Sequence, residues 1–72
     1  MNKPLSPRLV DVLQALAAGE TLSETATRLS LSEDTVKTHR RRLYARLGAR
    51  TGAHAVAIAS RSELLTPIGG GR

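Results

Sequence analysis

The sequence predicts an all-α domain of four short helices, and three observations support that prediction. Helix-capping residues recur along the 72-residue chain, apolar residues follow each cap at helical spacing, and no segment alternates as a strand would. The chain contains no Cys, Trp or Phe and a single Tyr. Its core must therefore be built from Leu, Val, Ile and Ala, a composition that favours thin, closely packed helices.

The first helix is predicted over residues 7–18. Ser6 can cap it, and Pro7 suits the first helical position because the N–H that proline lacks would have no partner there. Gly19 follows as a C-terminal stop. The apolar side chains that recur on one face are Leu9, Val12, Leu13 and Leu16.

The second helix is predicted to run from Leu22 to Leu29, about two turns. Thr21 and Glu24 have the spacing of a capping box, in which each side chain accepts a hydrogen bond from the other residue's backbone N–H. Its inner face comprises Leu22, Thr25, Ala26 and Leu29. Only Ser30 and Leu31 separate it from the next cap, so the connection must be a tight turn.

The third helix is predicted to begin after a cap at Ser32, to run to Leu47 and to stop at Gly48. Its first turn carries Glu33 and Asp34, which the positive end of a helix dipole favours. This helix is the longest of the four and the richest in arginine.

A fourth helix is predicted after a cap at Thr51, ending near Arg61 or Ser62. Residues 1–65 are then expected to form one domain. Residues 66–72, which include three consecutive glycines, are expected to be a flexible tail.

The positive charge is concentrated in the middle of the chain. The formal net charge is +5, and residues 28–50 hold seven Lys or Arg against two carboxylates, so this segment carries the whole excess. A clustered basic segment is the electrostatic footprint of a phosphate-binding surface. A solvated helix face would give the same composition, so the direction of the side chains decides between the two interpretations.

Size and composition exclude several classes of protein. No apolar run approaches the ~18 residues of a membrane span, and residues 1–4 lack the apolar stretch of a secretory signal, so a soluble cytoplasmic protein is expected. The chain is too short for a deep cleft with a supporting shell, which argues against an enzyme. Because it lacks paired Cys and His ligands and a Gly-rich loop, we expect neither a metal nor a cofactor.

Helical spacing places most basic side chains of the third helix on its outer face. At 100° per residue, Leu43 and Leu47 fall within about 20° of Val36 and define the buried stripe. Arg40 falls on the core side, so its stem must carry the charge out to solvent. The opposite face carries Thr38, Arg41 and Ala45, flanked by Lys37 and Arg42.

A short helix, a tight turn and a longer basic helix form a helix-turn-helix, whose second helix is the recognition helix that enters a DNA major groove about 12 Å wide. Lys or Arg can donate to guanine, and Thr can bond a base edge or contact a thymine methyl. Phosphates suit residues further along or around the helix, which are Arg42, Arg46 and Arg50. Two cap or early-helix residues, Ser23 and Thr35, could also reach a phosphate. We expect packing or a phosphate contact for His39, and plain surface for His54.

The stretch from Ser32 to Gly48 resembles the recognition segment of the LuxR/GerE family of helix-turn-helix domains. It reads Ser-Glu-Asp-Thr-Val-Lys-Thr-His, similar to the family's Ser-x-x-Thr-Val-Lys-x-His, and it closes with Arg-Leu-Gly where the family has Lys/Arg-Leu-Gly. Residues 5–8 resemble the family's opening, and Ala26-x-x-Leu29 its first helix-turn-helix helix; the likeness covers about residues 5–65. Four positions differ, since Leu9, Thr25, Ser30 and Arg40 stand where a glutamate, an isoleucine, a glycine and an apolar residue are usual.

The resemblance implies a four-helix fold whose third helix reads the major groove of double-stranded DNA. It implies base contacts at the lysine of Thr-Val-Lys, at the next residue and at the residue four past the lysine, which are Lys37, Thr38 and Arg41. It also implies a homodimer through the last helix, where we expect contacts at Ala57, Ile58 and Arg61. The full set of expected phosphate contacts is Ser23, Arg28, Thr35, His39, Arg42, Arg46 and Arg50.

The sequence thus predicts a bacterial-type transcription factor, cytoplasmic and nucleoid-associated, that binds a two-fold symmetric site as a homodimer. Nothing in it could receive a phosphoryl group or an acyl-homoserine lactone, so control would come from expression level, another protein or a longer parent chain. Two alternatives stay open. One is a module like region 4 of a sigma factor, monomeric and bound to promoter DNA and RNA polymerase; the other is an adaptor whose basic face docks an acidic protein.

Overall fold

A computed structural model describes residues 5–61 and holds four helices within that range. They are α1 (Pro7–Ala17), α2 (Leu22–Leu29), α3 (Glu33–Leu47) and α4 (Gly52–Arg61). The all-α prediction is confirmed, and α1 ends one residue before the predicted Ala18, which is its C-cap. The predicted tail, residues 66–72, and residues 62–65 of the predicted domain lie outside the described residues.

Each helix begins at the hydroxyl residue that the sequence predicts. Thr21 and Glu24 form the complete capping box, with N–O distances of 3.1 and 2.8 Å. The other three caps accept a hydrogen bond from the backbone N–H three residues later: Ser6 from Leu9 at 3.3 Å, Ser32 from Thr35 at 3.0 Å and Thr51 from His54 at 3.0 Å. These local bonds satisfy donors that a helix start leaves open.

Helix α2 ends in a left-handed residue, although that residue is a serine. Ser30 has φ 58° and ψ 44°. Its N–H donates to the Thr27 carbonyl at 3.2 Å, and the N–H of Leu31 donates to the Ala26 carbonyl at 2.9 Å, the bond pair of a Schellman motif. This motif makes the connection to α3 short and fixes its direction.

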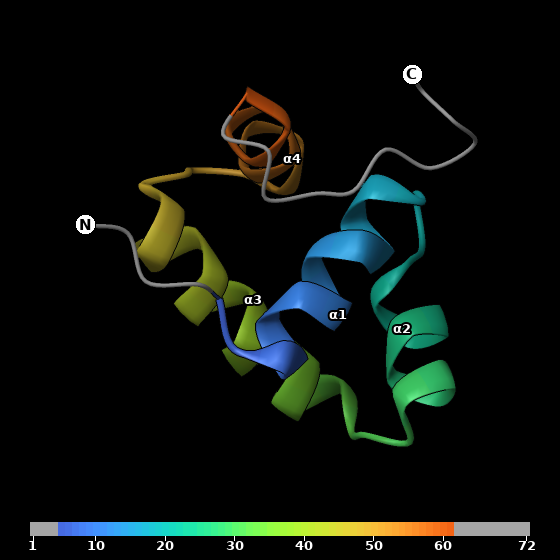
Figure 1. Ribbon diagram of the computed structural model, residues 1–72. Coiled ribbons are helices and arrows are strands. Elements are labelled where there is room, and N and C mark those ends of the chain that lie inside the picture. The colour runs from blue at the N-terminus through green and yellow to red at the C-terminus, as the bar shows by residue number, and fades with distance from the viewer. Residues whose placement is uncertain (1–4, 62–72) are drawn as a thin grey trace.

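The core lies where α1 crosses α3, and α4 packs against both of these helices. Helix α2 packs on α3 at its N-terminal end, so α2 and α4 occupy different ends of the α1–α3 pair (Figure 1). The buried side chains are Leu9, Val12, Leu13, Ala15, Thr25, Ala26, Val36, Leu43, Ala55 and Ala59. Leu47, predicted for the buried stripe, is half-buried against this core.

Helix α4 comes close to its neighbours because small residues face them. Ala55 and Ala59 are fully buried on its inner side. At its first residue, Gly52, an added Cβ would lie 3.0 Å from Leu16 Cδ2 and 3.3 Å from Tyr44 Oη. The start of α4 therefore rests directly on α1 and α3.

Thr25 is fully buried and its hydroxyl is satisfied. Its Oγ1 lies within donating distance of the Thr21 carbonyl, at 3.0 Å, and of Glu20 Oε1, at 3.1 Å. Glu20 also accepts from Arg28 Nε at 2.9 Å, and this bond is the main reason that the pKa of Glu20 is lowered. A threonine in place of the usual apolar residue thus ties the α1–α2 loop to α2.

Candidate nucleic-acid interface

The outer face of α3 is basic and exposed, as helical spacing predicts. Lys37, Thr38 and Arg41 are exposed, whereas Val36 and Leu43 on the opposite face are fully buried. The buried pair fixes the rotation of α3 about its own axis, because turning the helix would bring cationic side chains into the core. The three residues predicted to read bases therefore share one accessible face of one rigid element.

Thr38 has one hydrogen-bonding direction already in use. Its Oγ1 donates to the carbonyl of Asp34 at 3.1 Å, one turn earlier. While that bond is kept, the hydroxyl oxygen can still accept, and the methyl group stays available for apolar contact. The side chain is therefore held in a fixed rotamer that suits a base donor or a thymine methyl.

The residues predicted to contact phosphates come from three parts of the chain. Ser23 and Arg28 lie on α2, Arg50 lies between α3 and α4, and all three are exposed. On α3, Arg42 and Arg46 are exposed, whereas Thr35 and His39 are half-buried.

Arg28 and Thr35 each make a side-chain hydrogen bond within the domain. Arg28 Nε donates to Glu20 Oε2, so a phosphate contact there would use its terminal nitrogens. Thr35 Oγ1 accepts from the Ser32 hydroxyl at 2.8 Å, which leaves the threonine proton available as a donor. Arg28 is exposed and Thr35 is half-buried, so both can still contact a phosphate as predicted.

His54 is more than the plain surface residue that the sequence indicates. Its Nδ1 accepts a hydrogen bond from the backbone N–H of Arg50 at 3.1 Å, and its own N–H donates to Thr51 Oγ1. The ring keeps Nε2 available for a further hydrogen bond. His54 thereby completes the α4 cap and anchors the loop that carries Arg50.

Arg40 lies on the core side of α3, as predicted, and is half-buried. Its Nε is fully buried and has no hydrogen-bond partner among residues 5–61. An apolar residue at this position would leave no such donor. The arginine therefore fits its site less well than the apolar residue usual in LuxR/GerE domains.

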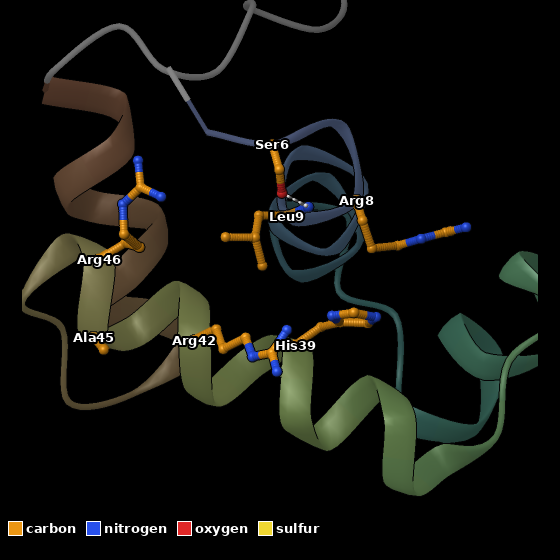
Figure 2. A pocket seen from close by; sticks show the side chains of 7 residues that line it. All are labelled: Ser6, Arg8, Leu9, His39, Arg42, Ala45 and Arg46. Atoms are coloured by element: carbon orange, nitrogen blue, oxygen red, sulfur yellow. Dashed lines mark hydrogen bonds between the residues drawn. The ribbon is translucent and has the colours of Figure 1, made fainter. Parts of the chain in front are cut away.

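A groove with a volume of about 470 Å³ separates the start of α1 from α3 (Figure 2). The α1 end contributes Ser6, Arg8 and Leu9, and α3 contributes His39, Arg42, Ala45 and Arg46. The sequence predicts phosphate contacts for three of the α3 residues, His39, Arg42 and Arg46, but does not single out Arg8, which lines the same groove. The available signal was the first turn of α1, which carries this arginine and no acidic residue.

The outer side of α4 carries the residues predicted for a dimer contact. Ala57 and Arg61 are exposed and Ile58 is half-buried. They lie on the same helix as Ala55 and Ala59, whose side chains are fully buried. An aliphatic side chain beside a small residue gives this side of α4 an apolar centre with a charged residue at its end.

The fold and this surface define a class of protein. A short helix, a three-residue turn and an exposed basic helix, held in a four-helix domain, form a helix-turn-helix DNA-binding domain. Residues 3–59 match the family model described as "Bacterial regulatory proteins, luxR family". The chain belongs to this family of transcriptional regulators, which is not a family of enzymes.

Similar proteins with names are transcriptional regulatory proteins and a response regulator, consistent with this family. A probable transcriptional regulatory protein NarL from Mycobacterium tuberculosis is 44% identical over 85% of this chain and 28% of its own length. Transcriptional regulatory protein MctR from Rhizobium johnstonii is 33% identical over 94% of this chain and 32% of its own length. The crystal structure of response regulator ChrA, from a heme-sensing two-component system, superposes with a TM-score of 0.84 at 34% identity, over 90% of this chain and 32% of that one. The chain thus spans about a third of these relatives.

Residues 5–61 hold neither a helix that could span a membrane nor a cluster that could bind a metal ion. None of the helices in residues 5–61 is long and apolar enough to cross a membrane. The same residues contain no group of three or more His, Cys, Asp or Glu side chains placed to hold a metal ion.

Proposed function

We propose that this domain binds a two-fold symmetric DNA site as a homodimer, with α3 of each copy in the major groove, and regulates transcription from that site. The observation that carries the proposal is the outer face of α3, where Lys37, Thr38 and Arg41 are exposed opposite the fully buried Val36 and Leu43. The helix can approach base edges closely at this face because its remaining residue, Ala45, is small and exposed.

Each base-reading residue has a distinct role in this proposal. Lys37 and Arg41 donate to guanine O6 and N7, and the planar guanidinium of Arg41 can do so with two parallel bonds. Thr38, whose proton is directed at Asp34, accepts from a base amino group or packs on a thymine methyl. The readout is therefore strongest for a short run that contains guanine.

The surrounding residues hold the phosphates on either side. They are Ser23, Arg28, Thr35, His39, Arg42, Arg46 and Arg50, and their contacts set register and affinity more than sequence preference. Most of these residues belong to the segment 28–50, which carries the net positive charge of the chain and so attracts the negatively charged phosphates. Binding should accordingly weaken as salt rises.

A second copy is expected to join through α4. Ala57, Ile58 and Arg61 supply the contact, and an isologous pairing of α4 with α4 places two recognition helices on one face of the DNA. A 72-residue chain gains stability from such a partner because it buries a small core by itself.

The setting of this activity is also a proposal. Because the curated relatives are about three times as long, control is expected to come from a longer parent chain, from another protein or from expression level. We place the protein on the nucleoid in the cytoplasm. RNA polymerase or another regulator is the expected protein partner at the promoter.

Selection of bound sequences from a random duplex pool tests the proposal. The expected result is a symmetric consensus that binds two chains per duplex in sedimentation analysis, with half of the site binding more weakly. Monomeric binding together with capture of core RNA polymerase would favour the sigma-like alternative. Enrichment of no duplex, together with binding to acidic proteins, would favour the adaptor and refute the proposal.

A further inference from the structure

We infer that the groove between the start of α1 and α3 binds the sugar-phosphate backbone of the DNA strand that borders the major groove, and that Arg8 is a phosphate contact there. This inference rests on the proposed function and extends it to a helix outside the helix-turn-helix. It assigns an occupant to the cavity of about 470 Å³ (Figure 2).

The lining of the groove favours an anion. Four basic side chains line it, Arg8, His39, Arg42 and Arg46, and no carboxylate among residues 5–61 does. The first turn of α1, an 11-residue helix, has no acidic residue, so the positive end of its dipole adds to the same field. Arg8 does contact Asp11 at 3.5 Å, but both side chains are more than 40% exposed, and a pair of this kind is weak and screened by salt.

The position of the groove favours a DNA strand. His39, Arg42 and Arg46 follow one another at helical spacing along one flank of α3, next to the face that carries Thr38 and Arg41. A helix in a major groove has a sugar-phosphate backbone along each side. The strand on the α1 side therefore passes over this flank, where the first turn of α1 stands opposite.

The shape of the groove fits a nucleotide unit better than an isolated ion. Leu9 and Ala45 add an apolar surface between the basic side chains, and deoxyribose can pack against it. A cavity of this volume lies in the range of sites for small organic molecules, roughly 300–1,000 Å³. A lining that combines basic side chains with apolar surface matches a sugar flanked by phosphates.

The test compares Arg8→Gln with Gln14→Glu, an exposed position on the same helix that lowers the net charge by the same amount. Affinity for the selected duplex is measured from 50 to 200 mM salt, and circular dichroism checks that each variant is folded. Arg8→Gln removes one phosphate contact from each chain, and therefore two from the dimer, which lowers the slope of log K against log salt by about 1.8. Over this fourfold range of salt the variant should lose about 12-fold less affinity than the parent. Gln14→Glu should keep the parent slope.

A third variant tests the same inference through an expected gain in affinity instead of a loss. Asp11→Asn removes the carboxylate that competes for Arg8, so it should bind the duplex more tightly and with an equal or steeper salt slope. An unchanged slope in Arg8→Gln, or an equal change in Gln14→Glu, overturns the inference while leaving the proposed function in place. A parent chain that binds no duplex removes the proposed function itself.

The same groove could instead take a small free anion, and a separate measurement distinguishes the two. Inorganic phosphate is titrated into the DNA-free protein while the amide signals of Arg8 and His39 are followed by NMR. Saturable shifts with phosphate, together with an unchanged duplex slope in Arg8→Gln, would contradict the assignment to DNA. Weak, unsaturated shifts with a reduced duplex slope support it.

Discussion

Replacing Ser30 by glycine should stabilise the domain. Ser30 ends α2 in the left-handed region, with φ 58°, and an L-residue enters that region at a cost of roughly 1–2 kcal/mol. Glycine avoids this cost but loses more backbone entropy on folding, which offsets about 0.5–1 kcal/mol. The expected net gain in the free energy of unfolding is therefore about 0.5–1 kcal/mol.

Helix α1 offers a matched control because it ends in the same bond pattern around a glycine. The N–H of Gly19 donates to the Leu16 carbonyl at 3.1 Å, and the N–H of Glu20 donates to the Ala15 carbonyl at 3.0 Å. Gly19 has φ 79°, and an added Cβ would meet nothing within 4 Å. Gly19→Ser should therefore lose about as much stability as Ser30→Gly gains, through the backbone alone.

Urea unfolding followed by far-ultraviolet circular dichroism measures both changes. We expect the midpoints to move in opposite directions with equal m-values, and a gain of 1 kcal/mol would raise Tm by roughly 4–8 °C in a domain of this size. A midpoint for Ser30→Gly at or below that of the parent, while Gly19→Ser is destabilised, would refute the argument. The serine side chain would then stabilise the turn by more than its backbone costs.

Four further results are expected. Arg40→Met should stabilise the fold by about 1 kcal/mol in the same urea assay, because it removes a buried donor that has no partner in residues 5–61. The pKa of Glu20 is lowered from 4.5, chiefly by the hydrogen bond from Arg28, so its contribution to stability is complete above that pH and is lost as the pH falls through the lowered folded value. Glu20→Gln should therefore lose less stability than the parent as the pH falls below 4.5. Arg41→Ala should cost on the order of 1–3 kcal/mol in binding and relax the preference at one base position, whereas a uniform loss across sequences would make it a phosphate contact. Ile58→Asp should leave the monomer folded and weaken binding to the full site, and an unchanged dimer in sedimentation would refute the α4 interface.

The helices could be predicted from the sequence because their signals are local. The Thr21–Glu24 box, the caps at Ser6 and Ser32 and the stop at Gly48 each depend on residues within one turn. The outward direction of Lys37 and Arg41 follows from the same spacing, since an apolar stripe can face only one way. The roles of these side chains at DNA stay predictions, because they depend on a partner.

The remaining features depend on contacts between segments that lie apart in the sequence. Arg8 lines the groove only because the N-terminal end of α1 lies against α3, and no local sequence pattern specifies that contact. Arg28 bonds to Glu20 across a turn, eight residues away. His54 caps the backbone of Arg50, an arrangement that a lone histidine on a helix does not indicate. In each case the contact depends on how a turn or a helix crossing places the two segments relative to each other.

The salt dependence of duplex binding tests the central claim most directly. Fluorescence anisotropy of a labelled selected duplex, measured from 50 to 200 mM salt, gives the number of phosphates that the protein neutralises. A dimer with 6–10 phosphate contacts should lose about 10³–10⁵ in affinity over this range, with log K falling linearly against log salt. Failure to bind any duplex above background at 50 mM salt, or affinity that does not change with salt, would contradict the assignment of α3 and its basic surroundings to DNA.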